Sequence, residues 1–180
     1  MNPLVSIIIP VFNQNEAHLR DCIDSALGQS YNNIEIIISD NHSTNGASGI
    51  IAGYHSDKIQ KVRPPIFLDM TGSFAFAASC AGKASKYLSF LSSDDLLASN
   101  AIMELVELAE NNQSAVFLAG NIIQSHQPPD NFEQVENRIR TSKSIPGLQT
   151  FKQTVAFPHW LMFPWQPYVA ITVTLTVDVK

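Results

Sequence analysis

Two adjacent carboxylates, Asp94 and Asp95, are the residues of this sequence whose types and spacing most directly suggest chemistry. They follow the apolar run 87–91, which is typical of a buried strand. Because a charge is costly to bury, the pair is expected to face solvent, a ligand or a metal ion at the strand's carboxyl end. Carboxylate oxygens suit Mg²⁺ or Mn²⁺. Taken alone, however, an acid before a helix more often caps that helix.

Short β-branched runs alternate with segments of helical periodicity along the first 124 residues. Near-continuous apolar strands in such an alternation are typical of a parallel sheet that helices cover on both faces. We therefore expect a Rossmann-like α/β fold with a mostly parallel sheet, and we expect the acids to lie at its carboxyl edge. The sequence predicts strands at 4–9, 34–39, 59–62, 86–91 and 115–119. It predicts a first helix that ends near Gly28 and a second that is capped by Ser43-Thr44 and ends near Tyr54. Two further helices are predicted at about 73–84 and 100–110.

The last third of the chain has a different pattern. Residues 126–144 are polar and irregular, which predicts a long loop or flap. The segment 157–165 packs aromatic residues between prolines, and we interpret His159 and Trp160 within it as part of a core plug or exposed patch, sugar stacking being the alternative. Strict alternation of apolar and polar residues predicts one strand over 171–179, with one wet face that favours self-association.

Composition excludes several classes of protein. With 180 residues, 45% hydrophobic and 15% charged, the chain is long and apolar enough to fold around a core. A net charge of −5 without a basic stripe argues against nucleic-acid binding, and the absence of a GxGxxG turn argues against a dehydrogenase-type dinucleotide site. Cys22 and Cys80 lack metal-ligand spacing. Without a signal peptide or a long apolar run, we expect a cytoplasmic protein, at most peripheral to the inner face of the membrane.

Four ordered segments, 3–13, 25–31, 34–44 and 87–95, resemble the successive motifs of the family 2 glycosyltransferases. The resemblance covers about residues 2–125 and implies the A-type glycosyltransferase fold. It implies a nucleotide-sugar-binding domain at 1–125, followed by a flap and partial acceptor-side segment at 126–180. It also implies hexosyl transfer, with inversion, from a nucleotide-diphosphate sugar (a UDP-sugar is favoured) to a saccharide, lipid-linked or protein acceptor, as in cell-envelope polysaccharide biosynthesis.

The resemblance assigns roles to individual residues. Asp40 would accept a hydrogen bond from a base N–H such as that of uracil. The alternative role for Asp40 is structural, in an Asx turn or a helix cap. Phe12 stands where the family usually has Tyr and would lie against the base. The alternative is that Phe12 packs in the hydrophobic core. The nucleotide-sugar-binding residues would be Pro10, Phe12 and Asn13 against the base, Asp40 on the base and Asp94 on the ribose, with Asp95 as the ligand of Mg²⁺ or Mn²⁺.

The sequence departs from the family pattern in three places. Ser92 replaces an acid that many members carry two residues before Asp94. The segment 72–80 lacks the Arg or Asn that steadies the donor in many relatives, with Lys83 and Lys86 as candidate replacements or as solvated surface lysines. None of the acids Glu133, Glu136 and Asp178 fits a family motif, so the general base stays unassigned. A noncatalytic nucleotide-sugar-binding module is therefore the alternative function.

Overall fold

A six-stranded, all-parallel sheet forms the centre of the computed structural model, which describes residues 2–111, 117–119, 169–172 and 175–176. The sheet order is β3-β2-β1-β4-β7-β6. Its strands are β1 (Leu4–Val11), β2 (Ile34–Asp40), β3 (Ile59–Val62), β4 (Ser85–Phe90), β6 (Phe117–Ala119) and β7 (Val169–Thr172). A separate two-stranded antiparallel sheet pairs β5 (Asp95–Leu96) with β8 (Leu175–Thr176).

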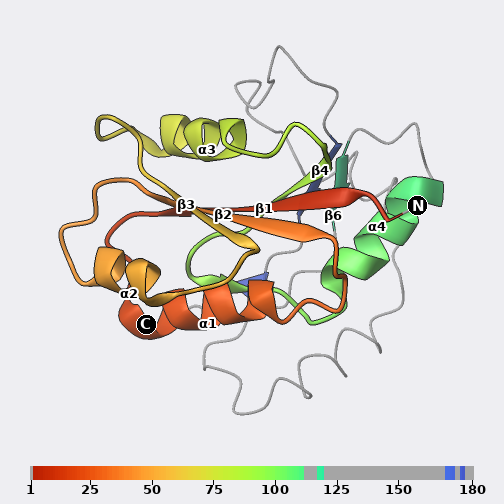
Figure 1. Ribbon diagram of the computed structural model, residues 1–180, viewed down its shortest axis with the longest axis horizontal. Helices are drawn as coiled ribbons and strands as arrows, with labels where there is room; N and C mark the ends of the chain where they lie inside the picture. Colours follow the sequence, from red (N-terminus) through yellow and green to blue (C-terminus); the bar gives the residue numbers. More distant parts are fainter. Residues whose placement is uncertain (1, 112–116, 120–168, 173–174, 177–180) are drawn as a thin grey trace.

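Helices cover both faces of the sheet, which confirms the expected architecture (Figure 1). Helices α1 (Glu16–Leu27) and α2 (Ala47–Gly53) lie on one face and α3 (Met70–Ser79) on the other, while α4 (Ala101–Asn111) joins the same apolar core as α1. Alternate residues of each central strand face the two layers: Ile36 and Ile38 pack with α1 and α2, and Ile37 packs with α3. Burial on both faces explains why β1 and β2 are apolar along most of their length instead of alternating between apolar and polar residues.

The strand register brings the carboxyl ends of neighbouring strands to one edge. Val11 pairs with Asp40, and Ser39 pairs with Val62, so β1, β2 and β3 end side by side. The loops that follow them therefore start at the same level, as the expected site requires.

Two helices begin at other residues than predicted, and capping chemistry explains both differences. Helix α2 begins at Ala47 after Gly46, because Ser43 and Thr44 hold the loop after β1 instead of capping the helix. Helix α3 begins at Met70, three residues before the predicted start, because the side chain of Asp69 accepts a hydrogen bond from the backbone N–H of Gly72 at 2.7 Å.

The prediction of one continuous strand over 171–179 is wrong. Strand β7 ends at Thr172 and lies between β4 and β6 in the parallel sheet, whereas β8 pairs with β5 in the second sheet. Alternation reports one wet and one dry face, but it does not show where a chain leaves one sheet for another. The predicted flap at 126–144 and the aromatic segment at 157–165 lie outside the described residues.

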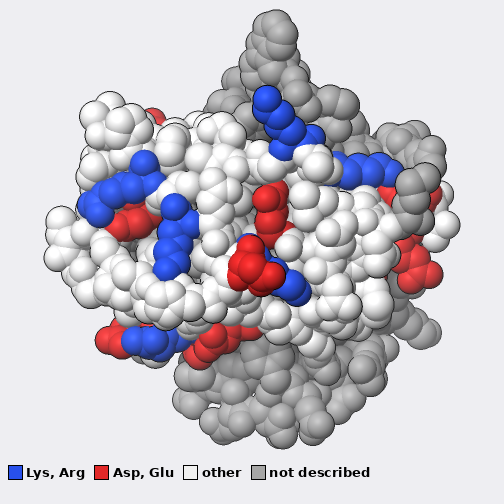
Figure 2. Space-filling model, viewed as in Figure 1, with Lys and Arg blue, Asp and Glu red and all other residues white. Residues whose placement is uncertain are grey.

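No helix among the described residues combines the length and apolar character needed to cross a bilayer. Figure 2 shows acidic and basic side chains interspersed on one face of the molecule, without a continuous basic stripe in the part that the structure describes.

Candidate functional site

The loop after β1 connects two other loops at the carboxyl edge of the sheet. The backbone N–H of Asn13 donates to Ser43 Oγ at 3.0 Å, and the backbone N–H of Thr44 donates to Asn13 Oδ1 at 2.7 Å. On the other side, Gln14 Nε2 donates to Ser93 Oγ at 3.1 Å. The loops after β1, β2 and β4 are thereby joined. The structure brings the segments that carry Asp40, Asp94 and Asp95 to one edge, as the sequence predicts.

The prediction that Pro10 lies in the loop after the first strand is wrong, because Pro10 lies within β1. Pro10 is buried, and it pairs with Ser39 of β2. The pairing of β1 with β4 ends at Ile8, so Pro10 has a neighbouring strand on one side only, a position where a missing N–H is tolerated. Phe12 and Asn13 lie beyond the strand and are exposed, which removes the alternative of Phe12 as a core aromatic.

Asp40 is buried at the end of β2, where three donors surround its carboxylate. Oδ1 accepts from the backbone N–H of Ser43 at 2.9 Å, and Oδ2 accepts from Ser48 Oγ at 2.6 Å and lies 3.3 Å from Arg63 Nη1. The alternative of a turn held by the Asp40 side chain is therefore realised, although Asp40 does not cap α2. It does not exhaust the carboxylate, which offers about four lone-pair sites.

Three influences set the pKa of Asp40. Burial raises it, but the hydrogen bonds from Ser48 and Ser43 and the charge of Arg63 outweigh burial and leave the pKa below its usual value. A lowered folded-state pKa stabilises the fold above the unfolded-state pKa, about 3.9, and this contribution is lost as the pH falls through the folded-state pKa.

Asp40→Asn is expected to lower the free energy of unfolding at pH 7 by about 1 kcal/mol, because the amide has only one acceptor atom and cannot accept both from the Ser43 N–H at one oxygen position and from Ser48 and Arg63 at the other. The difference from the wild type should shrink as the pH falls from about 5 to 2, because the wild-type carboxylate then becomes protonated. Urea unfolding at several pH values measures this difference. A difference that stays constant with pH would contradict the ionised role.

Asp94 and Asp95 occupy different environments in the segment after β4. Asp94 is exposed, whereas Asp95 is buried in β5 and its backbone N–H donates to the carbonyl of Ser92 at 3.0 Å. The same carbonyl accepts from Cys22 Sγ at 3.3 Å. Burial raises the pKa of the Cys22 thiol, and the charges of Asp95 and Asp94 raise it further. Both contacts use the backbone carbonyl of Ser92, which any residue at this position would supply.

Among the described residues, no three His, Cys, Asp or Glu side chains gather where they could hold a metal ion. Magnesium is commonly bound through one or two carboxylates together with substrate phosphates. One carboxylate, the role that the family resemblance assigns to Asp95, is therefore enough for an ion that shares its coordination with a diphosphate.

The polar side chains within the segment 72–80 are occupied or buried: Ser79 Oγ donates to the carbonyl of Phe76 in its own helix, and Ser73 is buried. The two lysines considered as replacements lie elsewhere. Lys86 lies near the start of β4, at the opposite edge from the site, and its Nζ pairs with Glu110 at 2.5 Å. Lys83 precedes the same strand. The interpretation of these two lysines as surface residues is the better one.

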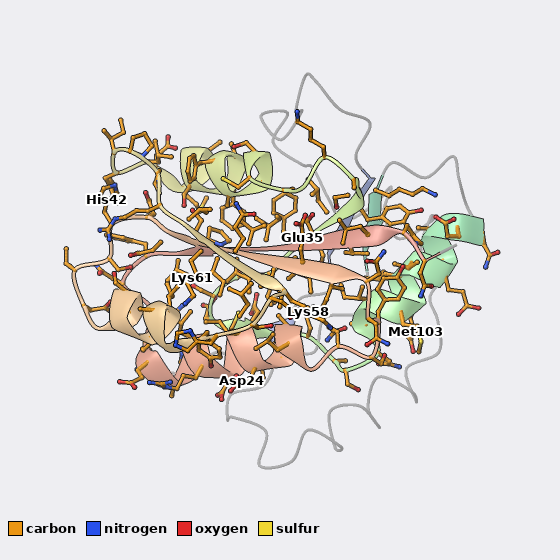
Figure 3. The ribbon with its side chains drawn as sticks, viewed as in Figure 1. Asp24, Glu35, His42, Lys58, Lys61 and Met103 are labelled. Carbon is orange, nitrogen blue, oxygen red and sulfur yellow. The ribbon has the colours of Figure 1, made fainter. Side chains whose placement is uncertain are left out.

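Sequence reasoning missed a cation that does lie at the correct edge, Arg63. It directly follows β3, and this position after a predicted strand could have indicated it. His42 and Asn41 were also missed as site residues. Figure 3 shows His42 beyond the strand ends at one extreme of the view, with Met103 of α4 toward the other. The candidate acids Glu133, Glu136 and Asp178, together with His159 and Trp160, lie outside the described residues.

The sequence pattern of the family described as Glycosyl transferase family 2 matches residues 6–171, further along the chain than the four motifs. The uncharacterized glycosyltransferase EpsJ of Bacillus subtilis (strain 168) is 35% identical over 153 residues, which cover 81% of this chain and 42% of EpsJ. An uncharacterized glycosyltransferase of Haemophilus influenzae (strain ATCC 51907 / DSM 11121 / KW20 / Rd) is 41% identical over 103 residues, 56% of this chain and 40% of that protein. The chain thus spans less than half the length of these two relatives.

Solved structures share the fold. The crystal structure of residues 1–349 of S. aureus TarS in complex with UDP superposes with a TM-score of 0.57 at 18% identity, covering 70% of this chain and 38% of that one. The complex of the same TarS residues with UDP-GlcNAc gives a TM-score of 0.59 at 16% identity, covering 71% and 37%. At such identities the likeness shows the fold alone.

Proposed function

The chain belongs to glycosyl transferase family 2, and from this premise we propose that its first 125 residues bind a uridine-diphosphate sugar and a divalent cation at the carboxyl edge of the sheet. The sugar would pass with inversion to a saccharide, lipid-linked or protein acceptor, in a reaction of the kind that builds cell-envelope polysaccharide. Residues 126–180 would contribute to the flap and the acceptor side.

One observation carries this proposal: the hydrogen bonds of Asn13 and Gln14 join the three loops that bear the candidate ligands. Asp40 would then contact the base of a single nucleotide, while Asp94 would contact its ribose and Asp95 the cation on its diphosphate. The complexes of TarS with UDP and UDP-GlcNAc, which share this fold, support this class of donor.

Each residue has a chemical role in this proposal. Asp40 accepts from the ring N–H of uracil, a donor that cytosine lacks, and Phe12 offers a face to the base. Asp94 accepts from a ribose hydroxyl. Asp95 holds the cation, Mg²⁺ or Mn²⁺, which when bound neutralises charge on the leaving diphosphate.

The proposal predicts that the protein binds UDP more tightly than CDP, by about 10-fold to 100-fold, because a hydrogen bond to a carboxylate is at stake. Titration calorimetry with Mn²⁺ measures both affinities. Asp40→Asn should remove most of the preference, whereas Asp24→Asn, an exposed acid of α1, should retain it. Equal affinities of the wild type for the two nucleotides would contradict the role of Asp40.

A noncatalytic nucleotide-sugar-binding module is the second candidate. The observation that favours it is the absence of a cation from α3, where many relatives steady the donor. Release of UDP from UDP-sugars, measured with and without acceptors, separates the two functions: tight binding of UDP without any release supports the module.

A further inference from the structure

We propose that Phe67 forms, together with Phe12, a two-ring wall against which the nucleobase stacks. This inference rests on the proposed function and adds a residue to it. Phe67 lies in the segment between β3 and α3, far in sequence from every motif that points to the site. The ring centroids of Phe12 and Phe67 are 5.0 Å apart with an interplanar angle of 58°.

Both rings are about half exposed, Phe12 at 49% and Phe67 at 56%. Two adjacent aromatic rings that remain this accessible offer a planar ligand a large apolar surface. Phe12 follows β1 directly, next to Asn13, which joins the loops of the site. The second ring thus extends the surface that already borders the proposed base contact.

The segment 63–68, here called the strap, is bound by three consecutive residues, Asp40, Asn41 and His42. Asp40 pairs with Arg63 at its start. His42 Nε2 lies 3.0 Å from the carbonyl oxygen of Pro64, to which it donates. Asn41 binds both backbone groups of Leu68, donating from Nδ2 to the carbonyl at 2.8 Å and accepting at Oδ1 from the N–H at 3.0 Å.

The contacts of the strap connect Phe67 to the proposed base contact. Asp40 is proposed to bind the base, and Asp40, Asn41 and His42 together position the strap that carries Phe67. His42 adopts a left-handed backbone conformation, with φ of 61°, to do so. A ring held in advance loses less conformational entropy when a ligand covers it, so Phe67 is suited to binding and not only to filling space.

The spacing of the rings also fixes the kind of stack. A base sandwiched between two parallel rings needs roughly 7 Å between them, twice the contact distance of carbon atoms. At 5.0 Å and 58° the rings touch each other instead. They form a continuous, angled wall, on which the base lies over one face and meets the edge of the other ring.

Calorimetry of UDP, uridine and inorganic diphosphate, each with Mn²⁺, tests this inference. Phe67→Ala should weaken UDP and uridine by the same factor, about fivefold to 20-fold, and leave diphosphate unchanged, because stacking acts on the base alone. Phe67→Tyr should retain affinity, and Phe67→Leu should recover only part of it. Met70→Ala, at an exposed apolar side chain of the next helix, is the matched control and should leave binding unchanged.

The outcomes separate the inference from the proposed function. If the wild type binds UDP, Phe12→Ala weakens it and Phe67→Ala does not, the inference is wrong and the proposed function stands. If the wild type binds neither UDP nor uridine, both are wrong. An equal loss for diphosphate in Phe67→Ala would show a general disturbance of the site and would also overturn the inference. Far-UV circular dichroism of each variant checks that the exposed substitutions leave the fold intact.

Discussion

Asp95→Asn is expected to abolish the Mn²⁺ dependence of UDP binding. In the wild type, Mn²⁺ should increase the affinity for UDP by at least about 10-fold to 100-fold. Loss of a residue that only orients a metal ligand already lowers metal affinity by about this factor, and Asp95 is proposed to bind the ion directly. Asparagine has the shape of aspartate but lacks the negative charge that strengthens the binding of a hard cation. Calorimetry with Mn²⁺ and with a chelator should therefore give the variant the same weak affinity in both conditions.

The neighbouring acid supplies the control for this experiment. Asp94 is exposed and is proposed to bind the ribose, so Asp94→Asn should weaken UDP in both conditions and retain the Mn²⁺ effect. Urea unfolding without ligand checks that the buried substitution at Asp95 leaves the protein folded. An Asp95→Asn variant that still responds to Mn²⁺ would refute the assignment of this carboxylate, and equal behaviour of the two variants would refute the division of roles.

The fold was predictable from sequence because its determinants are local and repeated. The runs 4–9 and 34–39 are apolar at all positions except Ser6, Glu35 and Ser39, which is typical of strands buried on both faces. Gly28 ends the first helix where expected. The acids at strand ends could then be placed at one edge, because parallel strands share the direction in which they end.

The rest depended on contacts between distant segments. Nothing in the local pattern shows that Ser43 and Thr44 bind Asn13 instead of capping a helix, or that Pro10 continues β1 along a neighbour on one side. Phe67 and Arg63 belong to no motif, and their roles follow from the fastening of the strap to residues 40–42. Hydrogen bonds across 20 to 30 residues leave no periodicity in the sequence.

Asn41→Ala is expected to produce the largest loss of stability among the polar substitutions of the site. The side chain of Asn41 is buried and satisfies both backbone groups of Leu68. Both hydrogen bonds are partly buried, and a typical hydrogen bond contributes about 0.5–1.5 kcal/mol, so the free energy of unfolding should fall by roughly 1–3 kcal/mol. Urea unfolding measures the change. Asn33→Ala, which removes an exposed asparagine that donates to the carbonyl of Asn2, should cost about 0.5 kcal/mol or less.

The same variant connects stability to recognition. Loss of the Asn41 clamp leaves the strap attached through Arg63 and Pro64, so Phe67 can move away from Phe12 while the rest of the base contact stays. UDP affinity should then fall, but by no more than in Phe67→Ala, because the clamp acts on the base only through that ring. Combining Asn41→Ala with Phe67→Ala should weaken UDP no further than Phe67→Ala alone. Additive losses in the double variant would mean that Asn41 supports the site by a route other than the strap.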